Sequence, residues 1–192
     1  MGGSTVDTRP MTVEDFYRFT DARPEDGKWE LFDGEPFLNA SPAYIHQRIV
    51  GNVLFAVDRQ LHGRNSLWEV IPGIGACVSD TSRPEPDVMV LPSLRAGLDP
   101  KARDTQQAIV LFEILSPSTS HRDLKWKRTA YTSMSALTHY IVVAQDEVNV
   151  VVFARDRGFA EHRLRSPDDV VDLPGLGVAL PLTEIYRDTG FI

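Results

Sequence analysis

Two acidic residues stand at or inside apolar segments of this chain. Glu113 lies within the apolar run 109–115, and Asp87 directly precedes the apolar run 88–90. A carboxylate in such a segment is costly to remove from water, so each needs a cation, a proton or a cluster of donors as its partner. Asp123 and Lys127 follow Glu113 in the chain. Two such acids with a nearby lysine indicate a metal-dependent hydrolytic site.

The elements that must position these residues follow from the apolar spacing. The segment 108–115 is almost wholly apolar, which is typical of a central strand covered on both faces. Asp33-Gly34 predicts a hairpin whose second strand, because of Pro36, lies at an edge. The pattern predicts an α/β fold (α+β mixed sheet) with a central mixed sheet flanked by helices, an N-terminal hairpin and extra C-terminal strands. Helices are expected over 13–19, 46–61, 123–137 and 182–186, and strands over 29–32, 35–38, 67–71, 75–79, 87–91, 108–115, 139–144, 148–154, 158–164 and 170–180.

Composition limits the class of protein. The chain has 192 residues, of which 42% are hydrophobic and 24% charged, and this predicts one domain over residues 11–192 after a disordered arm at 1–10. No apolar stretch approaches the roughly 18 residues of a membrane span, and the first residues lack the pattern of a signal peptide. We therefore expect a soluble, cytoplasmic protein that does not enter a membrane.

Cysteine and charge exclude further classes of site. Cys77 is the single cysteine, so neither an intramolecular disulfide nor a thiolate-rich zinc site can form. The formal net charge of −7 argues against nucleic-acid binding through bulk electrostatics, although it does not exclude a nuclease. Two of the four lysines fall in the segment 121–128, so we expect a locally basic helix there despite the negative net charge of the chain.

An ordered set of motifs carries a resemblance to a known family. The motifs are Trp29-Glu30-Leu31-Phe32-Asp33-Gly34-Glu35, Ser41-Pro42 with His46, Pro86-Asp87-Val88, Glu113-Ile114-Leu115-Ser116-Pro117, then Asp123, Lys127 and Tyr131, and His139-Tyr140-Ile141-Val142-Val143. Together they span about residues 11–187. The chain resembles a bacterial family of domains of unknown function labelled putative restriction endonucleases, within the PD-(D/E)XK nuclease superfamily. The resemblance implies a restriction-endonuclease-like core, a DNA substrate and a divalent metal.

The same resemblance assigns roles to individual residues. Asp87 and Glu113 match the two acids of the superfamily signature. Leu115 stands where the simplest signature has a lysine, and Lys127 on the following helix matches the relocated lysine of the family. Glu30 and His46 match further positions that bind metal or substrate, and Asp123 and Tyr131 are supporting positions.

The chemistry of these residue types is that of a hard cation. If Asp87 and Glu113 lie on adjacent strands and face the same side, magnesium or manganese would join their carboxylates, with water, a substrate oxygen and the backbone carbonyl of Ile114 as further ligands. Lys127 would orient the attacking water, or remove its proton if its own pKa were lowered. Asp123, Lys127 and Tyr131 are spaced four apart and therefore share one helix stripe.

Structural explanations stay open for each residue. Asp87 could cap a turn after Pro86, and Glu113 could lie on an exposed sheet face. Asp123 and Lys127 could form an ordinary surface pair, and Tyr131 could belong to the core. His46 could be a solvated residue of a first helical turn, and Glu30 could pair across the hairpin.

Two hypotheses of different classes follow. The first is a magnesium-dependent endonuclease that hydrolyses DNA phosphodiester bonds. The second is a catalytically inactive nuclease-fold dimer that acts as a binding or regulatory module, since fold alone does not determine function. An accessory protein whose nuclease activity needs a partner is a third possibility. Edge strands at 37–38 or 148–153 could pair about a two-fold axis, so we expect a homodimer.

Overall fold

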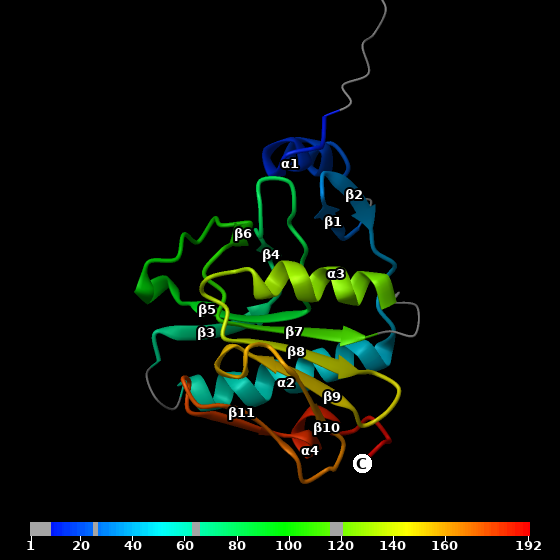
Figure 1. Ribbon diagram of the computed structural model, residues 1–192, viewed down its shortest axis with the longest axis vertical. Coiled ribbons are helices and arrows are strands. Elements are labelled where there is room, and N and C mark those ends of the chain that lie inside the picture. The colour runs from blue at the N-terminus through cyan, green and yellow to red at the C-terminus, as the bar shows by residue number, and fades with distance from the viewer. Residues whose placement is uncertain (1–8, 25–26, 63–65, 116–120) are drawn as a thin grey trace, which may run out of the picture.

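A six-stranded mixed sheet forms the centre of the structure (Figure 1). The computed structural model describes residues 9–24, 27–62, 66–115 and 121–192, with side chains from residue 124 onward in the last range. The strand order is β10-β9-β8-β7-β5-β3. β7 and β8 run parallel, and the other neighbouring strands run antiparallel. The strands are β3 (Trp68–Pro72), β5 (Val88–Pro92), β7 (Val110–Leu115), β8 (His139–Ala144), β9 (Val150–Ala154) and β10 (Glu161–Leu164).

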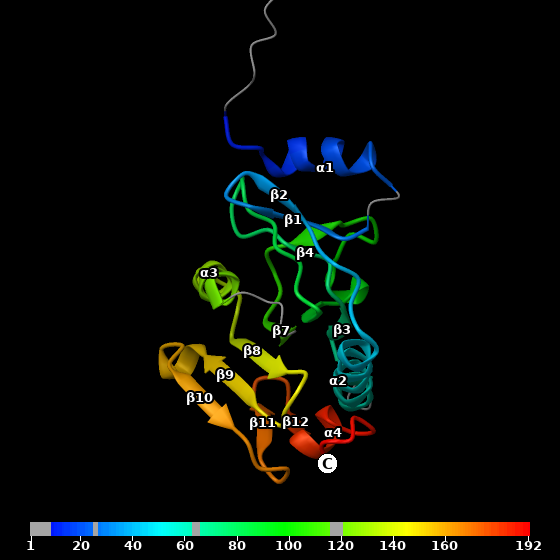
Figure 2. The same cartoon turned by 90° about the vertical axis from the view of Figure 1, so that its right-hand side faces the viewer.

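Helices cover both faces of this sheet, as the sequence predicts (Figure 2). α2 (Tyr44–His62) packs on one face together with α4 (Leu182–Ile185) and the hairpin of β11 (Val170–Leu173) and β12 (Val178–Pro181). α3 (His121–Thr132) packs on the other face. Among the described residues, no helix is both long and apolar enough to cross a membrane.

β7 is the central strand of the fold and is buried along its length. Because side chains alternate across a strand, Phe112 and Ile114 enter the core beneath α2, whereas Leu111 enters the core beneath α3. Glu113 shares the α3 face with Leu111. The prediction of a doubly covered strand is confirmed, and it places an acidic side chain under a helix.

The N-terminal part lies above one end of the sheet. α1 (Val13–Asp21) begins at a capping box formed by Thr12 and Asp15. β1 (Trp29–Phe32) and β2 (Glu35–Leu38) pair with each other, and Leu31 of β1 also exchanges backbone hydrogen bonds with Arg83 in an isolated antiparallel bridge. The predicted turn between them is confirmed, since Asp33 and Gly34 have φ values of 49° and 85°, the left-handed conformations of a tight hairpin. Short pieces complete the fold: β4 (Gly75–Ala76), β6 (Asp104–Thr105), η1 (Leu94–Ala96) and η2 (Arg155–Arg157).

The structure differs from the sequence-based expectation in several places. The strand expected over 75–79 is limited to β4, and the strand expected over 158–164 begins at Glu161. The helix expected over 123–137 ends at Thr132, because the Arg155 guanidinium binds the carbonyls of Met134 at 2.6 Å and Leu137 at 2.7 Å and so stabilises a chain of turns. The single strand expected over 170–180 is two antiparallel strands. Most of the arm expected at 1–10 lies outside the described residues.

Candidate active site

Three elements bring a buried ionic network together above β7. The Lys127 ammonium of α3 lies 3.0 Å from Glu113 Oε1 and 3.0 Å from Glu30 Oε1 of β1. The Tyr131 hydroxyl donates to Glu113 Oε1 at 2.8 Å. All four side chains are buried. A cation and a neutral donor therefore hold the Glu113 carboxylate from the same helix.

The local sequence explains this convergence. Lys127 and Tyr131 are one helical turn apart and so project from one face of α3, toward the face of β7 that carries Glu113. The hairpin is tied to the same helix, since Trp126 Nε1 donates to Asp33 Oδ2 at 2.7 Å and its ring packs edge-on against Phe32. The side chain of Asp123 lies outside the described residues.

Glu30 is held on both of its oxygens. Asn39 Nδ2 donates to Oε2 at 2.8 Å, and the backbone amide of Glu85 donates to Oε1 at 2.6 Å. Its partner across the hairpin is Phe37, so Glu30 does not take part in a charged cross-strand pair. Because both oxygens of Glu30 accept hydrogen bonds, this residue suits a supporting role in which it holds the Lys127 ammonium in place.

Asp87 and His46 form the more accessible half of the site. Asp87 Oδ2 accepts the amide of Ile114 at 2.7 Å and lies 3.4 Å from His46 Nε2. The Asp87 and His46 side chains are 15% and 13% exposed. His46 Nδ1 is buried and has no hydrogen-bond partner within the described part of the chain. The structure therefore places His46 of α2 against one acid and Lys127 of α3 against the other.

The electrostatics separate the two acids. Burial raises the pKa of Glu113 to about 7 despite the Lys127 charge, and the charges of Asp87 and Glu30 add to this increase. Burial also acts to raise the pKa of Asp87, but the hydrogen bond from His46 and the charges of Lys28 and His46 outweigh it, so this pKa is lowered.

The cation and the phenol of the network keep their protons. Burial acts to lower the pKa of Lys127, yet Glu113 and Glu30 outweigh burial and raise it. Burial and the negative charge of Glu113 raise the pKa of Tyr131 well above its ordinary value. At neutral pH, Lys127 is an ammonium and Tyr131 is a hydrogen-bond donor.

The donor set fits a hard divalent cation. In the residues that the structure describes, Asp87 Oδ1 and Glu113 Oε2 accept no hydrogen bond. One oxygen of each carboxylate is therefore open to a metal ion. No group of three or more His, Cys, Asp or Glu placed to hold a metal occurs in the same residues. Two carboxylate oxygens completed by water and substrate suit Mg²⁺, which retains several waters, better than Zn²⁺. Ile114, expected to offer its carbonyl, is seen here donating its amide to Asp87.

Sequence reasoning missed Lys28. Its ammonium donates to the carbonyl of Glu85 at 3.1 Å, and its charge lowers the pKa of Asp87 and opposes the raised pKa of Glu113. The Lys28 side chain is 38% exposed, and its ammonium lies 3.7 Å from Glu85 Oε1. Lys28 lies two residues before Glu30 in the chain, and this proximity was the one sequence signal that could have indicated its role.

Comparisons with known proteins identify the family and the fold of this chain. A family model named Uma2 and described as a putative restriction endonuclease matches residues 13–183. The chain belongs to the Uma2 family. Every residue of the network lies within the part that matches the Uma2 model. A solved structure of a putative nuclease of DUF820 from Anabaena variabilis superposes with a TM-score of 0.76 at 17% identity, over 92% of this chain and 98% of that one, so the two chains share a fold. A search of curated proteins returned no match.

Proposed function

We propose that this chain is a magnesium-dependent endonuclease that hydrolyses DNA phosphodiester bonds at Asp87, Glu113 and Lys127, with manganese as an alternative metal. The observation that carries the proposal is a pair of carboxylates, Asp87 and Glu113, each with one oxygen that accepts no described hydrogen bond. A buried ammonium contacts the second of them, Glu113. The family description supplies the class of reaction and the choice of DNA.

The chain's own groups prepare the site for a cation. The Ile114 amide fixes Asp87 through Oδ2, and the Lys127 ammonium and Tyr131 hydroxyl fix Glu113 through Oε1. Asp87 Oδ1 and Glu113 Oε2 would hold the metal. A bound Mg²⁺ would supply Lewis-acid polarisation of the phosphoryl group and a more acidic water.

Lys127 acts as a fixed positive charge in this proposal. Its raised pKa leaves no free amine to accept a proton at neutral pH. The ammonium orients Glu113 and stabilises negative charge that develops on the phosphoryl oxygens. His46 contacts Asp87 and positions it from the opposite side.

Cleavage by single-residue variants tests the site. Asp87→Asn and Glu113→Gln should each lower magnesium-dependent cleavage of mixed DNA substrates by about 100-fold or more, the scale on which one preorganised group acts. Asp168→Asn, at an exposed loop position, is the matched control. Calorimetric titration with Mg²⁺ and Mn²⁺ should show uptake by the wild type that both site variants weaken. Full activity in Asp87→Asn would remove the metal assignment.

One observation favours the alternative of an inactive binding module. Lys127 already neutralises much of the charge on Glu113 and Glu30, so the network is satisfied without a metal. In that case the fold would act as a homodimer that pairs through an edge strand such as β2. The prediction of an edge strand at 148–153 is wrong, because β9 lies between β8 and β10, so β10 is the free edge on that side of the described sheet. Absence of metal uptake together with a dimer in sedimentation would favour this module over the nuclease.

A further inference from the structure

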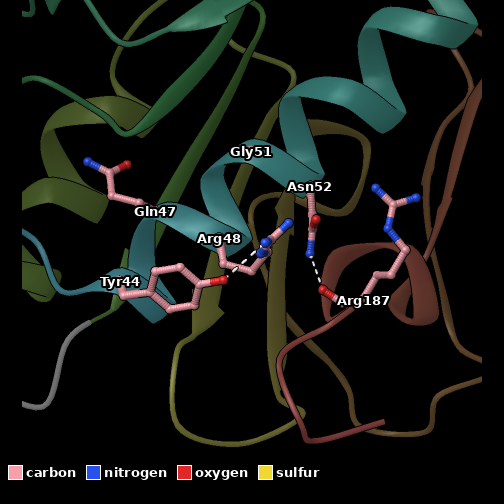
Figure 3. A pocket seen from close by; sticks show the side chains of 6 residues that line it. All are labelled: Tyr44, Gln47, Arg48, Gly51, Asn52 and Arg187. Carbon is pink, nitrogen blue, oxygen red and sulfur yellow. Dashed lines mark hydrogen bonds between the residues drawn. The ribbon is translucent and has the colours of Figure 1, made fainter.

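A second polar pocket lies on the outer side of α2. It has a volume of about 340 Å³ and is lined by Tyr44, Gln47, Arg48, Gly51 and Asn52 of α2 and by Arg187, which follows α4 (Figure 3). None of these residues belongs to the network of Glu113 and Lys127.

Two arginines give this pocket its charge. Arg48 donates to the Tyr44 hydroxyl at 3.0 Å, and the Arg187 guanidinium stands 5.6 Å from the Phe55 ring. Within the described chain, neither guanidinium is ion-paired with a carboxylate, whereas Arg59 on the same helix makes two hydrogen bonds with Glu184. Asp188 acts on Arg48 through space without an ion pair. Two guanidinia that make no ion pair with a described carboxylate, in a chain of net charge −7, favour an anionic ligand.

The pocket is preorganised. Asn52 is 3% exposed, and its amide donates to the carbonyls of Ile185 at 3.0 Å and Arg187 at 2.7 Å. These bonds fix the segment after α4 against α2 and hold Arg187 beside the helix. A Cβ atom added at Gly51 would meet no atom within 4 Å, so the glycine leaves the pocket open.

The pocket has a defined relation to the candidate active site. His46, which contacts Asp87, is two residues from Arg48 on α2, so the two side chains project to nearly opposite sides of the helix.

We propose that this pocket binds a backbone phosphate of the DNA substrate, on the side of α2 away from His46 and Asp87. The assignment rests on the proposed nuclease function for the identity of the anion. Arg48 and Arg187 bind the phosphate, and the Tyr44 hydroxyl, which accepts from Arg48, holds that guanidinium at the pocket.

Binding of a fluorescent DNA duplex tests the pocket, measured by anisotropy over a series of salt concentrations with EDTA present to prevent cleavage. Arg48→Ala with Arg187→Ala should weaken binding at least about tenfold and reduce the slope of log K against log salt by about one, because the pair neutralises one phosphate. Gly51→Leu should weaken binding by filling the pocket without any change of charge. Arg163→Ala with Arg165→Ala, at the opposite edge of the sheet in and after β10, removes the same charge and should have less than half the effect on the slope.

The outcomes separate this proposal from the nuclease proposal. Equal effects of the pocket and control pairs, or none from Gly51→Leu, would overturn the pocket assignment, as would a loss of binding that follows a change of oligomeric state in sedimentation. If the wild type cleaves DNA with magnesium and the pocket variants bind DNA as tightly as the wild type, the pocket proposal is wrong and the nuclease proposal stands. Pocket-dependent binding without wild-type cleavage contradicts the nuclease alone.

Discussion

Lys127 Nζ and Glu113 Oε1 lie 3.0 Å apart in the interior, and the same ammonium contacts Glu30. One cation therefore serves two buried carboxylates. Removing a partner from such a pair leaves charge buried without compensation, which costs more than the pair itself contributes.

Lys127→Met should destabilise the fold strongly. The methionine fills a similar volume but leaves Glu113 and Glu30 without their cation, so we expect a loss of about 3–5 kcal/mol in the free energy of unfolding. Urea denaturation at neutral pH measures it. Lys125→Met, exposed on the same helix, should change stability by about 0.5 kcal/mol or less. Equal stabilities of the two variants would show that the network contributes little.

Tyr131→Phe should have a smaller effect with the same origin. It removes the hydroxyl that donates to Glu113 and leaves the ring packed against Tyr140. A hydrogen bond to a charged group contributes about 1.5–3 kcal/mol. A double-mutant cycle with Glu113→Gln, followed by thermal denaturation, should show coupling between the two positions. Additive effects would mean that the hydroxyl acts independently of the carboxylate.

Gly73→Ala should disturb Asp87 through the backbone. A Cβ at this position would lie 1.6 Å from the carbonyl oxygen of Pro86, and the Gly73 amide donates to the carbonyl of Asp87 at 3.1 Å. We expect destabilisation of about 1–3 kcal/mol, the range found for overpacking, and a loss of metal-dependent cleavage. Gly51→Ala is the matched control, because open space surrounds it within a helix, and it should stabilise the fold by up to about 1 kcal/mol. Unchanged stability in Gly73→Ala would show that the backbone at Pro86 shifts to accept the added Cβ without a cost in free energy.

Acid should weaken the start of α1 in a defined pH window. The Thr12 hydroxyl and the Arg18 guanidinium hold the pKa of Asp15 at about 2, below its ordinary 3.8. Because the folded-state pKa is lowered, this stabilisation is complete above about pH 4 and is lost as the pH falls toward 2. Denaturation at a series of pH values should show that Asp15→Asn lacks this part of the acid sensitivity. The same dependence in both proteins would assign it to other carboxylates.

The fold and part of the site were predictable from local patterns. The apolar run around Glu113 specifies a buried strand, and the antiparallel neighbour that follows Asp87 brings the two acids to one region. The spacing of Lys127 and Tyr131 specifies a shared helix face. The strand and the helix face follow from their periods. The pairing of the two strands was assumed, and the role of Lys127 was implied by the family resemblance.

Other features depend on contacts between distant segments, which leave no periodic trace. Glu30 meets Lys127 because Trp126 and Asp33 join α3 to the hairpin, and the end of α3 is set by Arg155 from the end of β9. The pocket on α2 exists because Asn52 binds carbonyls more than a hundred residues away. Each of these is a single polar side chain whose partner only the folded chain reveals.

The Trp126–Asp33 hydrogen bond spans 93 residues of sequence. Contacts of such separation form only after the entropy of closing a long loop has been overcome, so they belong to the slow part of folding. The ammonium of α3 can meet the carboxylate of the hairpin only when both ends of this loop have docked. A nascent or partly unfolded chain would thus lack the assembled acid–lysine centre, and any activity of that centre would be confined to the complete fold.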